Sequence, residues 1–247
     1  DRFLELASAV GIKPLFVFFD DCWNTDFHAG RQPEPVPGVH NSGWVQSPGS
    51  KRVLDPSTWG PLEEYVKGVL ASFGDDDRVL MWDLYNEPGT RDLGVRSLGL
   101  LREAFRWARE VEPTQPLSVG VWFDNDELNG FQLSNSDVVT FHNYHDAENL
   151  EAQIGVLRAH GRPMICTEYM ARTRGSLFES CLPVFKRENV GCINWGFVDG
   201  KTQTKYPWGS EEGSPEPKPW FHEILHGDGT PYRQDEVELI RRLTSSE

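Results

Sequence analysis

The sequence has no surplus of positive charge and no long apolar run. Among its 247 residues, 38 are acidic and 24 are basic, which gives a formal net charge of -14. Proteins that bind nucleic acid or anionic membranes neutralise phosphates with lysine and arginine. A membrane-spanning helix needs about 20 consecutive apolar residues. The sequence therefore argues against nucleic acid and membrane as partners.

Cysteine is scarce, and its spacing shows no metal-binding pattern. The four cysteines, Cys22, Cys166, Cys181 and Cys192, form no CxxC pair. A chain of this size can bury a core without disulfides, so we expect buried free thiols. No N-x-S/T sequence indicates secretion, and the N-terminal sequence DRFLELASAVGIK does not resemble a signal peptide. Localisation stays open: cytoplasmic, or secreted or periplasmic if an upstream leader has been removed.

Motifs for common cofactors and repeat architectures are also missing. No GxGxxG follows a candidate strand, which argues against a dinucleotide-dependent oxidoreductase. No internal repeat or low-complexity tract interrupts the chain. We expect no cofactor and no metal.

The apolar residues instead predict alternating strands and helices. Short apolar runs that look like buried strands alternate with amphipathic stretches, as in a parallel sheet covered by helices. The predicted strands are 12–19, 79–85, 117–122, 138–144, 163–169 and 192–198. The predicted helices are 3–10, 61–73, 93–111, 148–160, 177–189 and 237–243. Within the fifth helix, Pro183 should cause a kink or a later start.

Two segments rich in Pro, Gly and Trp, 20–60 and 199–219, are too long to be simple connections. Both follow the carboxyl end of a predicted strand, which is where α/β folds build their sites. We therefore expect substrate contacts there, within a single α/β domain.

Two glutamates stand at the ends of predicted strands. Glu87 lies in the sequence WDLYNEPGT, and Glu168 lies in ICTEYMAR three strands later. In a closed β/α barrel such strand ends converge on one cavity. A carboxylic acid and a carboxylate are what glycoside cleavage needs, because one protonates the leaving oxygen while the other attacks the anomeric carbon. The alternative is that each glutamate forms a structural salt bridge.

Several motifs together carry a resemblance to a known family. They are Asn86-Glu87-Pro88, Thr167-Glu168-Tyr169, His142-Asn143-Tyr144 and Asn194-Trp195-Gly196. This ordered set resembles the retaining glycoside hydrolases of the (β/α)8 clan, especially family 5 cellulases. The stretches DDCWN, PGVHNSGWVQSPG and NWGFVDGKTQT are similar to bacterial proteins labelled 1,4-β-xylanase or cellulase-family glycosyl hydrolase.

The resemblance implies a (β/α)8 TIM barrel and an O-glycosyl hydrolase that acts on β-linked poly- or oligosaccharides with retention. In it Glu87 is the general acid/base and Glu168 the nucleophile, while Asn86 binds the sugar hydroxyl beside the reacting carbon. Tyr144 orients Glu168, and the remaining implied contacts with the sugar come from His142 and from Trp195 as a platform under the ring. The choice among xylan, glucan and mannan, and between endo and exo action, stays open.

Two features depart from the family pattern. The family has a histidine near the end of the third strand, where this chain has Asp20-Asp21-Cys22-Trp23. We take Asp20 as a candidate contact at that corner. Six strand-helix units are predicted where a closed barrel needs eight, so residues 1–247 resemble a single catalytic domain from the third strand onward, without the first two strands. We expect weak activity or none from such a chain, and self-association is a further possibility.

The tryptophans divide into two groups. Three lie within strand or helix patterns and are predicted to be core residues: Trp82, Trp107 and Trp122. Four lie in predicted rim loops: Trp23, Trp44, Trp195 and Trp208. An amphipathic ring in such a loop can stack on a sugar face, and loop packing is the alternative for Trp23 and Trp44. In the same loop, we expect His40 and Asn41 to fold the chain.

Two alternative functions remain. His222-Glu223-Ile224-Leu225-His226 matches the HExxH motif of zinc proteases, but Pro219 and Gly227 leave little room for its helix, so a short surface helix is the default expectation. His142 and His145 have no clear third ligand for a metal. A non-catalytic carbohydrate-binding protein on an incomplete barrel would need the aromatic platform without the carboxylate pair. Because both glutamates are present, we rank the enzyme first.

Overall fold

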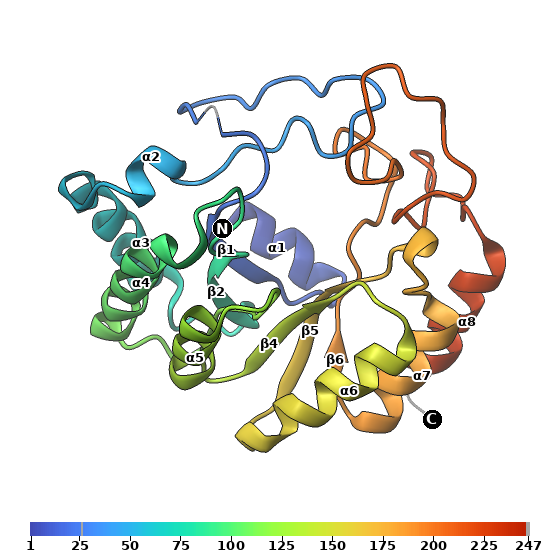
Figure 1. Cartoon of the computed structure of the whole chain (residues 1–247). Helices are drawn as coiled ribbons and strands as arrows, with labels where there is room; N and C mark the ends of the chain where they lie inside the picture. Colours follow the sequence, from blue (N-terminus) through green and yellow to red (C-terminus); the bar gives the residue numbers. More distant parts are fainter. Residues whose placement is uncertain (26, 246–247) are drawn as a thin grey trace. The chain divides into compact units, whose positions relative to one another are not determined.

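The computed structural model describes residues 1–25 and 27–245, so three positions in the predicted first loop and C-terminal tail lie outside the described residues (Figure 1). The chain divides into two compact units. The first consists of Asp1–Ala29 and Val45–Val139, and the second of Gly30–Trp44 and Thr140–Glu247. We describe each unit by itself.

The first unit is built on a three-stranded parallel sheet. Its strands are β1 (Leu15–Asp20), β2 (Met81–Asn86) and β3 (Leu117–Ser118), in the order β1-β2-β3. The helices of this unit are α1 (Arg2–Ala9), α2 (Ser50–Val53), α3 (Gly60–Phe73), α4 (Leu98–Val111) and α5 (Asp126–Asn135). Two 3-10 helices, η1 (Pro56–Thr58) and η2 (Gly94–Ser97), complete it.

Apolar side chains from this sheet and its helices form one continuous core. Helix α3 has Pro61 in its first turn, where the missing N–H costs nothing, and α4 ends at Glu112 in the left-handed conformation. The two helices pack against each other. Trp82 from β2 and Trp107 from α4 are almost completely buried in this core, as predicted. Burial of such large side chains supplies much of the favourable free energy of folding.

The second unit holds the other three-stranded sheet. Its order is β4 (Val139–Asn143), which begins at the unit boundary, β5 (Met164–Tyr169) and β6 (Gly191–Cys192). Its helices are α6 (Ala147–Leu157), α7 (Phe178–Glu188) and α8 (Gln234–Thr244), with 3-10 helices η3 (Arg158–His160) and η4 (Arg172–Arg174). Helix α7 packs against both α6 and α8.

The segment Gly30–Trp44 is held by the loop that follows β6. The Asn41 N–H donates to the Thr202 carbonyl at 2.8 Å, and the His40 N–H donates to the Ser210 hydroxyl at 3.0 Å. His40 and Asn41 are both buried. They fold the segment, as the sequence predicted.

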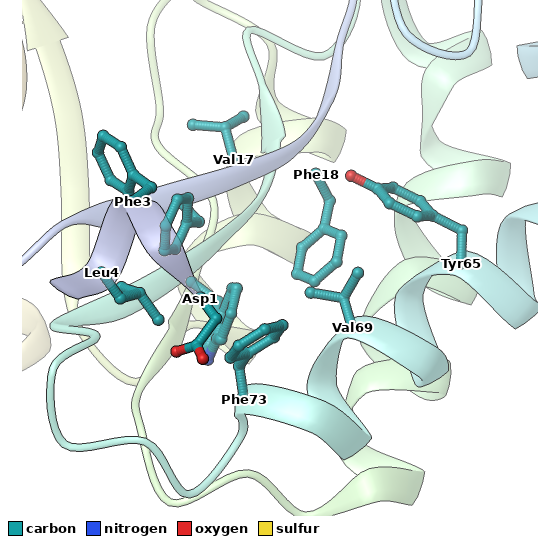
Figure 2. A pocket seen from close by; sticks show the side chains of 10 residues that line it. Asp1, Phe3, Leu4, Val17, Phe18, Tyr65, Val69 and Phe73 are labelled. Atoms are coloured by element: carbon teal, nitrogen blue, oxygen red, sulfur yellow. The ribbon is translucent and has the colours of Figure 1, made fainter. Parts of the chain in front are cut away.

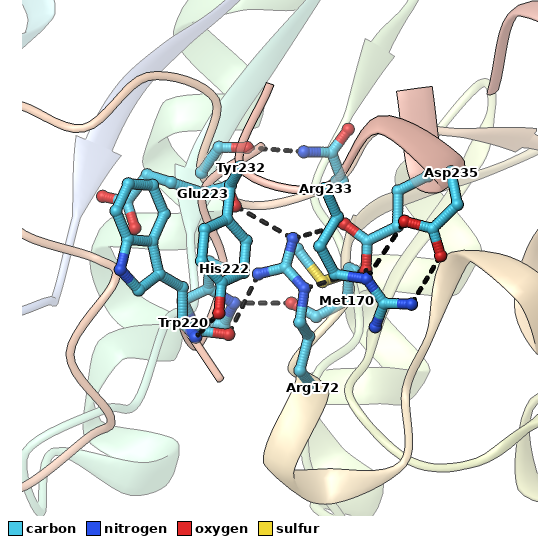
Figure 3. Close-up of polar contacts among 11 residues, drawn as sticks. Met170, Arg172, Trp220, His222, Glu223, Tyr232, Arg233 and Asp235 are labelled. Atoms are coloured by element: carbon cyan, nitrogen blue, oxygen red, sulfur yellow. Dashed lines mark hydrogen bonds and ion pairs between the residues drawn. The ribbon is translucent and has the colours of Figure 1, made fainter. Parts of the chain in front are cut away.

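A buried arginine ties the chain after β5 to the C-terminal helix (Figure 3). Arg172 donates from Nε and Nη2 to the two carboxylate oxygens of Glu236 on α8, at 3.0 and 2.6 Å. Its remaining bonds reach the carbonyls of Trp220 and Glu223, both at 2.9 Å. These acceptors satisfy a charge that would otherwise be costly to bury.

All six predicted strands are present, but two of them are short. β3 covers only two residues because side chains replace the ladder after it: the Val119 N–H donates to the Ser136 hydroxyl, and Gln132 donates to the Gly120 carbonyl. β6 ends at Cys192, and Gly196 has a φ of +82° that a strand cannot accommodate.

The α-helices differ from the prediction in three places, the first of which is α2, a short helix inside the segment 20–60 where no helix was predicted. Helix α5 was not predicted, because its apolar residues have little helical periodicity. Its start is marked by Asn125, whose side chain accepts from the Leu128 N–H at 3.0 Å. Helix α7 starts at Phe178 and runs through Pro183, so the proline does not delay its start.

The default expectation for the HExxH segment was wrong. In the described chain, residues 220–226 form no helix, and Trp220, His222 and Glu223 are buried. The His222 Nδ1 lies 2.5 Å from the Met170 carbonyl oxygen, and Glu223 accepts from the Thr204 hydroxyl. Without a helix, the two histidines lack the spacing on one face that a zinc-protease site requires.

One edge of the first sheet carries exposed apolar side chains. Strand β1 is an edge strand of its sheet, and Val17 on it is 46% exposed. Figure 2 shows the adjoining apolar pocket, a cavity of about 270 Å³ lined by Phe3, Phe18, Tyr65 and Phe73 among others.

No helix among the described residues has the length and apolar character needed to cross a bilayer.

Candidate active site

Glu87 stands at the carboxyl end of β2 in an unusual backbone conformation. Its φ is +43°, in the left-handed region that a residue before proline rarely adopts. The Thr90 side chain and N–H hold this turn by donating to the Glu87 carbonyl at 2.8 and 3.2 Å. Strained residues of this kind persist where the surroundings fix them, often at functional sites.

Asp20, at the end of β1, organises the neighbourhood of Asn86. Its Oδ1 accepts from the Asn86 side-chain amide at 3.2 Å and from the Cys22 N–H at 2.7 Å. Strands β1 and β2 pair here with Asp20 opposite Asn86. The sequence predicts Asp20 as a substrate contact, and this stays a prediction; in the structure Asp20 is buried and accepts a hydrogen bond from Asn86.

Asp21 anchors the turn that follows Glu87. Its carboxylate accepts from the Tyr85 hydroxyl at 2.6 Å, the Gly89 N–H at 2.8 Å and the Ser97 hydroxyl at 2.7 Å. Burial raises the pKa of Asp21, while these hydrogen bonds to the charged form oppose that rise. The sequence singled out this corner but gave no role to Asp21.

Cys22 brings a thiol to the carboxyl group of Glu87. Its Sγ donates to Glu87 Oε2 at 3.1 Å, and Thr90 Oγ1 lies 3.8 Å away. Burial, reinforced by the charge of Glu87, raises the pKa of this thiol well above its usual value. Trp23, which follows, is half-buried, and the Arg91 guanidinium lies over its ring.

In the second unit, Glu168 lies near the end of β5 between two partners from the end of β4. The Tyr144 hydroxyl donates to Glu168 Oε2 at 2.7 Å. His142 Nδ1 lies 3.4 Å from the same oxygen, and His142 is buried. A carboxylate that accepts such bonds is held in one orientation.

An aromatic ring and an imidazole contact Tyr144, and a second imidazole, His40, contacts both of them. Its ring makes an edge contact with Trp208, with centroids 4.9 Å apart, and a tilted contact with His222 at 5.5 Å. Burial lowers the pKa of His222 to about 3 and that of His40 to about 4. Both imidazoles are therefore neutral near pH 7. The sequence did not foresee the place of His222 in this cluster.

The predicted aromatic contacts have different surroundings. Trp195 follows β6, and its N–H donates to the Tyr169 carbonyl at 3.0 Å, so the Trp195 backbone is tied to β5. Trp44 is half-buried at the end of the Gly30–Trp44 segment. Trp122, predicted as core, is only half-buried, and its indole N–H donates to the Pro88 carbonyl at 3.1 Å.

Within each unit, the described residues include no group of three histidine, cysteine or acidic side chains close enough together to bind one metal ion. His145, the second histidine of the metal alternative, is exposed, whereas His142 is buried against Glu168. All four cysteines are free thiols, as predicted, but only Cys22, Cys166 and Cys181 are buried, and Cys192 is half-buried.

Comparisons with solved structures show the fold. The endo-β-1,4-mannanase from Thermotoga petrophila matches 97% of the chain at 16% identity with a TM-score of 0.62. The endo-1,4-β-mannanase from Rhizomucor miehei matches 97% at 13% identity with a TM-score of 0.61, and the β-D-glucuronidase from Dictyoglomus thermophilum matches 100% at 16% with 0.55. The predicted α/β fold of the (β/α)8 glycosidases is confirmed.

These structures are longer than the present chain. The matches cover 59% of the Thermotoga mannanase, 73% of the Rhizomucor mannanase and 43% of the Dictyoglomus glucuronidase, and only 34% of a β-glucuronidase from Faecalibacterium prausnitzii. The comparison with curated proteins found no relative.

The family comparison covers the strand ends described above. The family model described as Cellulase (glycosyl hydrolase family 5) matches residues 38–200, which is more than half of the chain and includes Glu87 and Glu168. The chain therefore belongs to glycosyl hydrolase family 5.

Proposed function

We propose that the protein hydrolyses β-linked glycosides by a retaining double displacement, with Glu87 as general acid/base and Glu168 as nucleophile. The observation that carries this proposal is the setting of the two glutamates at strand ends of a family 5 chain. One has a left-handed backbone fixed by its neighbours, and the other is held by Tyr144 and His142.

The chemistry proceeds in two steps. The Glu168 carboxylate attacks the anomeric carbon and forms an ester bond to it, while the bond to the leaving oxygen breaks and Glu87 gives that oxygen its proton. In the second step Glu87, now ionised, takes a proton from water. The water oxygen bonds to the anomeric carbon and releases Glu168. Two inversions give net retention.

The contacts with the substrate are proposed residue by residue. Asn86 is proposed to bind the hydroxyl beside the reacting carbon, and Trp23 to contact the sugar. We also propose that His142 lines the sugar-binding subsite, that Trp195 stacks under the ring, and that Trp44 lies at the rim. The solved relatives are named as mannanases, xylanase and glucuronidases, so the substrate is sought among β-1,4-mannan, β-1,4-xylan, β-1,4-glucan and aryl β-glucuronides.

The test measures hydrolysis of these four substrates by the wild-type chain and by Glu87→Gln and Glu168→Gln. Each substitution should lower turnover by at least about 100-fold, because a general acid or nucleophile contributes that much or more. Matched controls are Glu64→Gln and Glu148→Gln, two exposed glutamates, one in each unit, which should leave turnover unchanged. The anomer formed first, followed by proton NMR, should keep the β configuration.

Three results would contradict this proposal. Near-normal activity of either site variant would remove that glutamate from the mechanism, and an inverted first product would exclude the double displacement. If calorimetry detected sugar binding by a wild-type chain that does not turn over, the chain would instead be a carbohydrate-binding protein.

A further inference from the structure

The Cys22 side chain, just after β1, contacts the carboxyl group of Glu87, just after β2. The two residues are 65 positions apart, and their contact is made where β1 and β2 end side by side. Cys22 is 5% exposed, and its Sγ donates to Glu87 Oε2 at 3.1 Å. A buried donor so close to a carboxylate restricts how that carboxylate can turn.

The thiol is itself held in place. The Cys22 N–H donates to Asp20 Oδ1 at 2.7 Å, and the same oxygen accepts from the Asn86 side chain. The buried Asp20 carboxylate therefore holds both the backbone of Cys22, whose thiol lies beside Glu87, and the side-chain amide of Asn86. The Glu87 side chain has three rotatable bonds, and this contact limits its rotation.

We propose that Cys22 is a positioning residue for Glu87, whose thiol holds the carboxyl plane in the orientation that delivers the proton to the leaving oxygen. This inference rests on the proposed role of Glu87. It assigns Cys22 no contact with the substrate. A thiol is a weak donor, so we expect an effect on orientation and rate rather than on folding.

The test removes the donor. In Cys22→Val the side chain is slightly larger and donates no hydrogen bond, and in Cys22→Ser the donor is kept. Cys181→Val is the matched control, because Cys181 is equally buried but lies in α7 of the other unit. Thermal unfolding of each variant confirms that it is folded.

The readout is the dependence of kcat/KM on the leaving group. The probes are the 4-nitrophenyl and 2,4-dinitrophenyl β-glycosides of the sugar that the wild-type chain hydrolyses. The dinitrophenolate leaves without a proton, so its release does not depend on the acid, whereas poorer leaving groups need it. Cys22→Val should lower kcat/KM about tenfold for the nitrophenyl glycoside and less than about twofold for the dinitrophenyl glycoside. Cys22→Ser and Cys181→Val should behave like the wild type.

Equal effects of Cys22→Val on both probes would show a general structural role and overturn the proposal, as would no effect on either. These failures differ from failure of the proposed function, in which Glu87→Gln would leave turnover intact.

A second measurement does not need turnover. The rate at which iodoacetamide alkylates Cys22 at pH 9, followed by peptide mass spectrometry, should rise in Glu87→Gln, because burial still disfavours the thiolate but the charge of Glu87 no longer does. Glu64→Gln should leave the rate unchanged. An unchanged rate in Glu87→Gln would mean that the contact is not maintained in solution, and this would also overturn the proposal.

Discussion

At the scale of single residues, the least expected side chain is Glu223. It is completely buried in the second unit, and its Oε1 accepts from the Thr204 hydroxyl at 2.8 Å. Its Oε2 has no hydrogen-bond partner among the described residues. Burial, with a smaller contribution from the charge of Asp199, raises the pKa of Glu223 to about 7. Folding therefore favours the protonated carboxyl group.

This raised pKa makes the stability of the protein depend on pH. The contribution of Glu223 is fully present below the unfolded-state pKa of 4.5 and is lost as the pH rises through about 7. At pH 8 Glu223→Gln should therefore be more stable than the wild type, by at most about 3 kcal/mol. Below pH 5 this advantage should vanish. Urea unfolding of both proteins between pH 4.5 and pH 8.5 measures the difference.

Other groups do not obscure this comparison. His40 and His222, whose pKa values are lowered by burial, make the protein less stable as the pH falls below 6.5. Both histidines are present in the wild type and in Glu223→Gln, so the difference between the two curves isolates Glu223. A difference that stays constant across the pH range would show that Glu223 does not titrate in the folded state.

At the scale of elements, helix α8 depends on one buried ion pair. The Arg172 side chain is 2% exposed and that of Glu236 is 9% exposed, with Nη2 and Oε2 2.6 Å apart. Replacing Glu236 by Ala leaves a buried guanidinium without its counter-charge. Removing one partner of such a pair costs about 3–5 kcal/mol. Glu236→Ala should lower the free energy of unfolding by this amount in urea titrations.

Glu238→Ala is the matched control for this prediction. Glu238 is exposed on the same helix, where it accepts from Gln234 one turn away. Such a contact is worth a few tenths of a kcal/mol. If Glu236→Ala were no less stable than Glu238→Ala, the two carbonyl acceptors of Arg172 alone would suffice to bury it, and α8 would not depend on the ion pair.

Strands could be predicted where the sequence contains a clear apolar run. β1, β2, β4 and β5 lie in largely apolar runs of the sequence, so their positions could be predicted within a few residues. β3 ends early because side chains replace the ladder, and β6 is followed by a left-handed turn at Gly196; local sequence does not reveal such features. The same limit applies to the HExxH segment, where buried contacts of His222 and Glu223 override the helical motif.

The same limit applies to the candidate site: residues at strand ends could be predicted, but their side-chain contacts could not. Glu87 and Glu168 could be predicted because strand ends are visible in the sequence and the motifs resemble a family. The Cys22 contact with Glu87 could not be predicted, because it depends on the register between two strands far apart in the chain. The three consecutive polar residues Asp20-Asp21-Cys22 after a buried strand were the available signal. Their individual partners were visible only in the structure.

At the scale of the whole molecule, net charge disfavours self-association and exposed apolar surface favours it. The net charge of -14 favours solubility through mutual repulsion. On the first unit, however, several apolar side chains are exposed in and around α1 and β1, which are Phe3, Leu6, Val10, Ile12 and Val17. An exposed apolar strand edge of this kind is a common site of association. The self-association expected from the sequence therefore remains a prediction with a definite location.

Val17→Lys tests this location. A lysine on the open edge of β1 places a charge where another strand would pair, which disfavours edge-to-edge contact. The wild-type chain should associate at micromolar concentration in 0.5 M salt, where its net charge is screened, and Val17→Lys should shift the association to concentrations at least about tenfold higher. Sedimentation velocity over a concentration series measures both. Val156→Lys is the control, because Val156 on α6 is 72% exposed but lies outside this surface, and it should leave the association unchanged. If the two lysine variants associate equally, the association takes place on another surface. If the wild-type chain stays monomeric, the repulsion between molecules outweighs the attraction of the apolar edge even in high salt.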